Sequence, residues 1–377
     1  MKTAIDVIRR LKNAGFEAYF VGGAVRDFLL GKNPHDFDVA TSAAPEQVKG
    51  LFKRTVDTGI QHGTVLVLAG GAGVEVTTFR TESDYSDNRR PDSVAFVKSL
   101  EEDLKRRDFT INAMAMTEEL EVVDLYGGRK DLEEKLIRAV GEPDQRFRED
   151  ALRMLRAVRF SGQLDFAIDE YTLSSIQKNA ALIGSIAVER IKMELDKIMA
   201  NKHAVRSIDY LSLSGLADHL PSGGLFKTDW STFQPTGDPL SGWLYAFWHN
   251  SKDVSALSAY KFSNEEKIIL KKAMAAASLE SWNPWTYYTY TPKQLELAAA
   301  LTGRGDGWIE EKVSLPIESK SDLAINGRDL MDWTDNKPGP WLKEALGEIE
   351  RRIVFRLLEN EKDKIKDWFL DEYNRDK

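Results

Sequence analysis

The chain has 377 residues with no cysteine and five histidines, and its 52 basic and 60 acidic side chains leave a formal net charge of −8 at pH 7. The lack of cysteine excludes a disulfide framework and any thiolate metal site, so carboxylates are the expected ligands of a divalent ion. No stretch has the pattern of a secretory signal or a membrane span, so we expect a soluble, cytoplasmic protein with no membrane partner.

The first 140 residues alternate between helical and extended patterns, which predicts a mixed α/β domain. Helices are expected over residues 5–14, 24–31 and 44–52. Strands are expected over residues 17–23, 35–42, 63–70, 73–81 and 93–99. The polar segment "ESDYSDNRRPDS" (82–93) predicts a surface loop, and "RRDFTINAMA" (106–115) predicts a basic patch that opens a buried helix.

From about residue 140 the patterns become helical. Long helices are expected over residues 144–164, 188–200 and 339–370. The apolar face of the first is formed by Leu152, Leu155 and Val158, and that of the last by Leu342, Leu346, Ile349, Ile353 and Leu357. All nine tryptophans lie after residue 229, which favours a separate helical region with its own core.

The stretch "FVGGAVRDFLLGKNPHDFDVATSA" (20–43) combines a glycine pair with two aspartates one residue apart. In a strand Asp36 and Asp38 project side by side, where a divalent cation would stabilise them and orient nucleotide phosphates. Gly22 and Gly23 allow close approach of the main chain at a helix N-terminus, which suits an anion. The alternative is a surface turn with solvated acids, which is common for an isolated D-x-D.

Two further motifs carry charged side chains suited to a nucleotide. In "RRDFTINAMA", Arg107 is a candidate contact to a triphosphate or a base, with Asp108 orienting it; the alternative is an ordinary basic patch. In "REDALRMLRAVRF", Asp150 and Arg153 are three residues apart and share a face if the segment is helical.

Such a pair complements the Watson–Crick edges of adenine and cytosine, which present an amino donor beside a ring acceptor. Uracil and guanine present the reverse order, so Asp150 and Arg153 together would accept ATP and CTP and reject UTP and GTP. The alternative is a surface ion pair of small energetic value. Arg156 is placed to join this site, whereas Arg159 points away from Asp150 and is a candidate for phosphate.

A structural role is favoured for two residues of "AVERIKMEL". Arg190 and Glu194 are expected to pin the helix that carries Asp150 and Arg153.

The motifs resemble, in order, those of class II tRNA nucleotidyltransferases, the CCA-adding enzymes, and of their relatives the bacterial poly(A) polymerases. They are "GGAVRD", "DFDVATSA", "RRDFTINAMA", "DLYGGRKDL", "EDALRMLRAVRF" and "AVERIKMEL". The resemblance is strong over residues 16–200 and continues weakly through "DLAINGRDLMDW" and "GPWLKEAL", which are similar to the C-terminal region of Bacillus-type enzymes.

The resemblance implies an α+β fold, in which a polymerase-β-like nucleotidyltransferase head with a mixed sheet precedes an all-α neck, body and tail. The expected domains are a catalytic head (1–140), a neck for base recognition (141–200), a body (201–305) and a tail for tRNA binding (306–377). The implied activity is addition of C, C and A to the 3′ end of tRNA, from CTP and ATP and without a nucleic-acid template.

The resemblance also implies roles for single residues. Asp36 and Asp38 would hold the catalytic Mg²⁺, with Glu75 as a further carboxylate on a neighbouring strand. The nucleotide would be bound by Gly23, Arg26, Arg107, Asp150, Arg153, Arg156 and Arg159. The loop at 82–93 would take part in the switch from C to A addition. The tail would grip the tRNA elbow, so that an acidic chain binds RNA through one local groove; a homodimer is left open.

Two alternatives remain beside this interpretation. An A-adding enzyme or a bacterial poly(A) polymerase has a similar head, although poly(A) polymerases tend to end in a basic extension and this chain ends "LDEYNRDK". A catalytically dead RNA-binding protein is a remote alternative, because both metal carboxylates and the base-reading pair are present.

Overall fold

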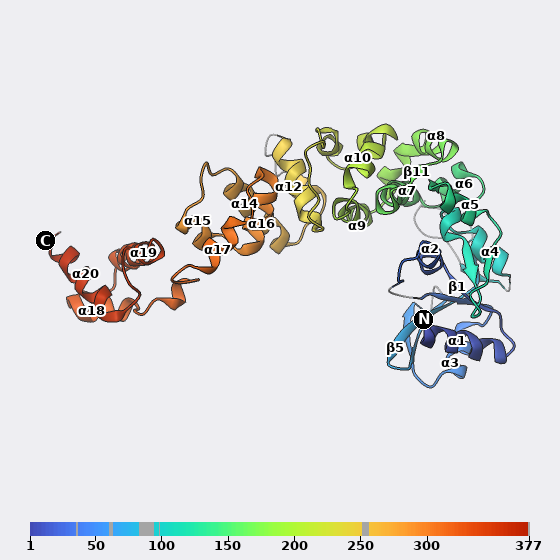
Figure 1. Ribbon diagram of the computed structural model, residues 1–377, viewed down its shortest axis with the longest axis horizontal. Coiled ribbons are helices and arrows are strands. Elements are labelled where there is room, and N and C mark those ends of the chain that lie inside the picture. Colours follow the sequence, from blue (N-terminus) through green and yellow to red (C-terminus); the bar gives the residue numbers. More distant parts are fainter. Residues whose placement is uncertain (35–36, 60–62, 83–93, 98, 251–255, 376–377) are drawn as a thin grey trace. The chain divides into compact units, whose positions relative to one another are not determined.

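The structure is a computed structural model that describes residues 1–34, 37–59, 63–82, 94–97, 99–250 and 256–375. Its contacts divide the chain into two compact units (Figure 1). The first unit comprises Met1–Pro239 with Ser258–Lys261, and the second comprises Leu240–Leu257 with Phe262–Lys377. The division of the chain into head, neck, body and tail stays a prediction.

A seven-stranded mixed sheet organises the N-terminal part of the first unit, with strand order β3-β4-β5-β2-β1-β8-β9. Its strands are β1 (Ala18–Val21), β2 (Val39–Thr41), β3 (Thr55–Gly59), β4 (Thr64–Ala69), β5 (Ala72–Thr78), β8 (Met114–Met116) and β9 (Val122–Asp124). The central strands β2 and β5 run parallel, and the other neighbouring pairs run antiparallel. Two small sheets pair β6 (Arg80–Glu82) with β7 (Val94–Phe96) and β10 (Leu136–Ile137) with β11 (Ala167–Ile168).

Short helices cover this sheet. They are α1 (Lys2–Asn13), α2 (Gly23–Leu29), α3 (Pro45–Leu51), α4 (Leu100–Lys105) and α5 (Gly128–Glu133). Leu100 and Leu104 of α4 pack on one face of the sheet in a cluster with Val21, Ala40 and Ala115. The helix α1 buries Ala4, Val7, Ile8 and Leu11, spaced as an amphipathic helix requires, and contacts β1, β2 and β5.

The rest of the first unit is helical. It contains α6 (Pro143–Glu149), α7 (Leu152–Leu164), α8 (Glu170–Asn179), α9 (Val188–Met199), α10 (Ala204–Leu213) and α11 (Leu216–His219). The helix α7 packs against α9 and α10. A Cβ at Gly162 would lie 2.3 Å from the Ser207 hydroxyl and 2.8 Å from the His203 carbonyl oxygen, so this glycine allows α7 and α10 to approach closely.

The C-terminal part of the chain is also helical. Its helices are α12 (Pro239–His249), α13 (Ala256–Ala259), α14 (Asn264–Ala277), α15 (Pro284–Thr289), α16 (Pro292–Thr302), α17 (Gly307–Val313), α18 (Gly327–Thr334), α19 (Pro340–Val354) and α20 (Lys362–Arg375). A core near the C-terminus is built from Ile317, Ile325, Leu330, Ile349, Ile353, Val354, Ile365 and Phe369. Within the described residues, no helix combines the length and the apolarity that crossing a membrane requires.

The order of a mixed-sheet region followed by helices agrees with the predicted fold class, but several elements differ. The segment 144–164 is not one helix, because α6 ends at Glu149 and α7 begins at Leu152. The segment 339–370 is also two helices, and Leu357 between them is 71% exposed instead of buried. The residues after "RRDF" form a single turn of 3-10 helix (Thr110–Asn112) and then the buried strand β8, and not an α-helix. Residues 83–93 of the predicted loop lie outside the described residues.

Candidate functional site

Two acidic residues, one directly before β2 and one in the middle of β5, occupy neighbouring positions of the sheet. The Val21 amide donates to the Asp38 carbonyl oxygen at 3.1 Å, which extends the β1–β2 ladder by one residue. The parallel register pairs Val39 with Val76, so the preceding step places Asp38 beside Glu75 on the same sheet face. Both valines are buried, whereas Asp38 and Glu75 are exposed. The pair therefore offers carboxylate oxygens to the solvent beside the start of β2.

The turn between β1 and α2 brings a guanidinium against the main chain. Gly22 has φ +73°, and a Cβ at this position would lie 3.0 Å from Arg107 Nη1. The helix α2 begins at the next residue, Gly23. Glycine at position 22 thus permits both the left-handed conformation and the approach of Arg107. The structure brings together the glycine pair and Arg107, which were predicted from separate motifs.

Arg26 is held within the fold, with only 4% of its surface exposed. Its Nε donates to Asp27 Oδ1 at 2.9 Å, and its Nη1 donates to Asn112 Oδ1 at 2.7 Å. Asn112 donates in turn through Nδ2 to Asp108 Oδ1 at 3.1 Å. Asn112 was not among the predicted site residues, although its position four residues after Asp108 in "RRDFTIN" was an available signal.

Arg106 and Arg107 share one buried carboxylate, that of Asp103. Arg106 donates to Asp103 Oδ1 from Nε at 3.0 Å and from Nη2 at 2.8 Å, and Arg107 Nη2 donates to Oδ2 at 3.0 Å. Burial raises the pKa of Asp103, but the charges of Arg107 and Arg106 and their hydrogen bonds lower it further, so that it stays below its ordinary value. The prediction that Asp108 orients Arg107 was therefore wrong, because Asp103 fills that role.

Asp108 binds Arg156 of α7 instead. Arg156 donates to Asp108 Oδ2 from Nε at 2.8 Å and from Nη2 at 2.7 Å. Burial raises the pKa of Asp108, but the charge of Arg156 and the hydrogen bonds from Asn112 and Arg156 lower it to about 2. This ionised carboxylate joins the "RRDFTIN" segment to the helix that follows Asp150.

The expectation that Asp150 and Arg153 share a helical face was wrong. Asp150 has an extended main chain between α6 and α7, with φ −141° and ψ 102°. Its Oδ1 accepts from the Leu152 amide at 3.1 Å, and its Oδ2 accepts from Arg190 Nη2 at 2.9 Å. Arg153 is buried in the first turn of α7. It donates to Glu149 Oε2 at 2.8 Å and to the Arg106 carbonyl oxygen at 2.9 Å.

Two ion pairs connect α9 to this region. Arg190 of α9 reaches Asp150, and Glu194 accepts from Arg159 Nε at 2.6 Å. Burial lowers the pKa of Arg159 more than the carboxylate of Glu194 raises it. These contacts agree with the predicted pinning role of Arg190 and Glu194. They also place Arg159 among buried side chains and not at an open surface.

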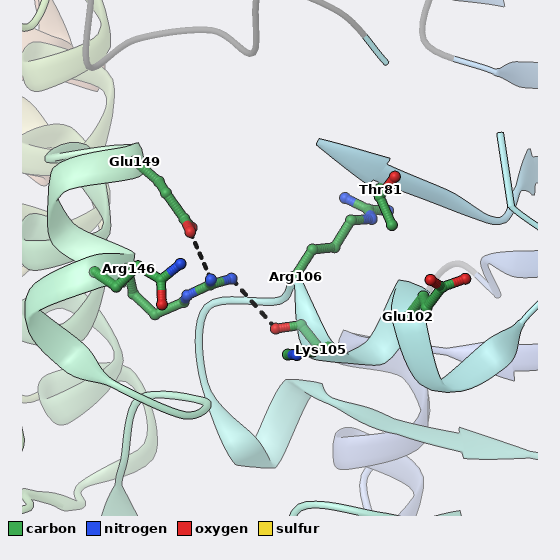
Figure 2. A pocket seen from close by; sticks show the side chains of 7 residues that line it. Thr81, Glu102, Lys105, Arg106, Arg146 and Glu149 are labelled. Carbon is green, nitrogen blue, oxygen red and sulfur yellow. Dashed lines mark hydrogen bonds and ion pairs between the residues drawn. The ribbon is translucent and has the colours of Figure 1, made fainter. Parts of the chain in front are cut away.

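A pocket of about 240 Å³ lies beside Arg106 and Glu149 (Figure 2). It is lined by Thr81, Glu102, Lys105, Arg106, Gln145, Arg146 and Glu149. Arg146 donates to the Lys105 carbonyl oxygen at 3.3 Å and pairs with Glu149 at 2.5 Å. The pocket contains none of the predicted site residues, but Arg106 and Glu149 in its wall both accept hydrogen bonds from Arg153.

The described residues contain no cluster of three or more aspartate, glutamate, histidine or cysteine side chains that could hold a metal ion. Asp36 lies outside the described residues, so its predicted position beside Asp38 is untested. The donors at hand, Asp38 and Glu75, are carboxylates, and their oxygen atoms suit a hard divalent cation.

Comparison with known proteins brings these observations together. Three family models match: the Poly A polymerase head domain over residues 18–138, the RNA and SrmB- binding site of polymerase A over 165–223, and tRNA nucleotidyltransferase domain 2 over 241–369. The chain is 43% identical over 395 residues to the CCA-adding enzyme of Geobacillus kaustophilus, covering 98% of this chain and 96% of that protein. It is 44% identical over 377 residues to the CCA-adding enzyme of Levilactobacillus brevis, covering 95% of each.

A solved structure extends this similarity to the fold. The crystal structure of the Bacillus stearothermophilus CCA-adding enzyme in complex with CTP matches with a TM-score of 0.89 and 39% identity, over 99% of this chain and 98% of that one. These matches confirm the predicted head with its polymerase-β-like sheet and the helical remainder. The chain therefore belongs to the family of the CCA-adding enzymes, the tRNA nucleotidyltransferases.

Proposed function

We propose that this chain adds C, C and A in turn to the 3′ end of tRNA and takes the nucleotides from CTP and ATP. The observation that carries the proposal is the similarity to CCA-adding enzymes over nearly the whole chain. The match to a poly(A) polymerase head domain alone would leave the A-adding and poly(A) alternatives open. The full-length relatives favour complete CCA addition over both.

The reaction of this family uses a divalent cation, which we assign as Mg²⁺ with Asp36 and Asp38 as its ligands. Such a cation neutralises phosphate charge and orients the groups for in-line displacement. Two observations support the assignment: Asp38 is exposed directly before the central strand β2, and the register of β2 and β5, extended by one residue, brings it beside Glu75. The place of Asp36 rests on the D-x-D motif.

Arg107 and the glycine turn are proposed to receive the nucleotide phosphates. The Arg107 guanidinium is already fixed by Asp103 and lies against Gly22, at the start of α2. A guanidinium suits this task because its planar donors match phosphate oxygens and its charge does not titrate. Gly23 and Arg26 are proposed to join this site because both lie in α2, which begins directly after Gly22.

Asp150 and Arg153 are proposed to read the base. The Asp150 carboxylate accepts one bond on each oxygen, from Leu152 and Arg190, and a carboxylate has roughly four lone-pair sites. It can therefore still accept from the amino group of cytosine or adenine. Arg153 would donate to the adjacent ring nitrogen from a position that Glu149 and the Arg106 carbonyl oxygen hold in place.

We propose tRNA as the acceptor, with the 3′ end at the head and the elbow at the tail (306–377). Whether two copies of the chain form a homodimer stays open.

The test is to incubate the protein with Mg²⁺ and tRNA that lacks its CCA end, with each nucleoside triphosphate singly and in pairs, and to sequence the products. CTP alone should add two C residues, ATP alone should add nothing, and both together should complete CCA. A run of A residues with ATP alone would favour a poly(A) polymerase. Addition of A only to tRNA that already ends in CC would favour an A-adding enzyme.

A further inference from the structure

Three of the predicted nucleotide-binding arginines meet at one aromatic ring, that of Phe160 in α7. The guanidinium carbon of Arg159 lies 3.9 Å from the ring centroid, that of Arg26 lies 5.2 Å away, and that of Arg156 lies 5.5 Å away. The ring itself is 4% exposed and packs edge-on against Phe109, with centroids 5.8 Å apart and planes at 82°. Arg26 comes from α2, whereas the other two arginines share α7 with Phe160.

Each of these arginines also pairs with its own carboxylate. Asp27 pairs with Arg26, Asp108 with Arg156, and Glu194 with Arg159. Even with these carboxylates, the three guanidinium groups around the Phe160 ring repel one another. The charge of Arg156, for example, lowers the pKa of Arg159. An aromatic ring attracts guanidinium groups through the negative face of its π system. It gathers these cations without supplying a further negative charge that would oppose a phosphate.

We propose that Phe160 is a positioning residue for nucleotide binding, which sets the Arg26 guanidinium of α2 relative to Arg156 of α7. This inference rests on the proposed function, because it assigns Arg26 and Arg156 to the nucleotide. The ring acts through the arginines and touches no reacting atom. Weakening its attraction for cations should therefore weaken the binding of CTP and ATP alike, while the choice between bases, assigned to Asp150 and Arg153, is unchanged.

The experiment replaces Phe160 with leucine and, separately, with phenylalanines that carry one, two or three ring fluorines. Fluorine withdraws charge from the ring face at nearly constant shape, so the series separates cation attraction from packing. We expect Phe160→Leu to raise KM for CTP and ATP about tenfold, in line with a desolvated cation–π contact. Each added fluorine should raise KM further, with little change in kcat, in KM for tRNA or in the melting temperature.

The same fluorinated residues at Phe147 serve as the matched control. Phe147 is fully buried on α6, and among the described residues no lysine or arginine lies over its ring. A KM that stays constant along the Phe160 series, or that rises equally in the Phe147 series, would overturn the inference even if Phe160→Leu fails to fold. These outcomes assume a wild-type protein that transfers C and A; absence of transfer by the wild type would overturn the proposed function instead.

Discussion

Replacing Asp150 with alanine tests whether this residue reads the base. In the structure its carboxylate is 18% exposed and accepts from the Leu152 amide and from Arg190. In the proposed complex it also accepts from the amino group of cytosine or adenine, and it would face the O4 acceptor of uracil. The substitution removes a favourable contact to CTP and an unfavourable one to UTP at the same time.

The magnitude follows from the cost of leaving a polar group unpaired in a largely buried site. That cost is about 1–3 kcal/mol, which corresponds to a loss of about 5- to 150-fold in kcat/KM for CTP. The ratio of kcat/KM for CTP to that for UTP should fall by at least this factor, because UTP also loses its clash. The fold should survive, since Arg190 is 31% exposed and ion pairs of this kind contribute little.

The assay measures kcat/KM for CTP, ATP, UTP and GTP on tRNA with matched 3′ ends. The control is Arg190→Met, which removes the ion pair and leaves the carboxylate in place, and which should preserve the CTP to UTP ratio. If Asp150→Ala slows the reaction but leaves that ratio unchanged, Asp150 only anchors Arg190, and the base is read elsewhere.

Three further predictions concern the rest of the site. Asp36→Ala and Asp38→Ala should each reduce nucleotide incorporation more than about 100-fold, because losing a metal ligand removes several kcal/mol of transition-state stabilisation. The affinity for tRNA in a gel-shift assay should stay nearly constant. If both variants keep more than about a hundredth of the activity, these residues do not hold the metal. The pKa of Asp108 is about 2, below its ordinary 3.8, so the ionised carboxylate should stabilise the fold by about 2 kcal/mol above pH 4 and lose this effect as the pH falls towards 2. In urea unfolding, the difference in free energy of unfolding between wild type and Asp108→Asn should shrink from pH 6 to pH 3. A constant difference would refute the lowered pKa of Asp108. Gly22→Ala should cost about 1–3 kcal/mol of stability and raise KM for CTP, because alanine is strained at a positive φ and Arg107 must move to make room for its Cβ. An unchanged melting temperature and KM would argue against the close approach of Arg107 to Gly22.

Much of the order of elements in the first 100 residues could be predicted because the strands and helices there carry a clear apolar period, and several are followed by glycine, as at Gly15, Gly22, Gly31 and Gly70. The prediction failed where that signal is weak. The short strand β3, "TVDTG", is stabilised by pairing with β4, which no local pattern reveals. The fully buried strand Met114–Met116 has no polar face, and a short apolar run of this kind does not distinguish a strand from a helix.

The site could be predicted in its residue types but not in its contacts. Arg107, Asp108, Arg153 and Arg156 were singled out from their motifs. Arg107 and Arg153 have partners four residues away, in Asp103 and Glu149, but other partners come from distant parts of the chain. Arg156 binds Asp108 across 48 residues, and Arg153 binds the Arg106 carbonyl oxygen across 47. Sequence spacing could not reveal these long-range contacts, because they form only when the chain is folded.

If Asp150 and Arg153 read the base as proposed, the length of the joint between α6 and α7 determines nucleotide choice. Asp150 lies in this joint, whereas Arg153 is fixed within α7 by its buried contacts. A residue inserted after Asp150 would interrupt the bonds that the Leu152 and Arg153 amides make to Asp150, whereas the hydrogen bonds within α6 and within the rest of α7 would stay in place. It would nevertheless displace Asp150 from Arg153 by up to about 3.5 Å, the reach of one residue. We therefore expect insertions at this joint to impair base selection more than they lower stability, so that nucleotide choice constrains the length of the joint.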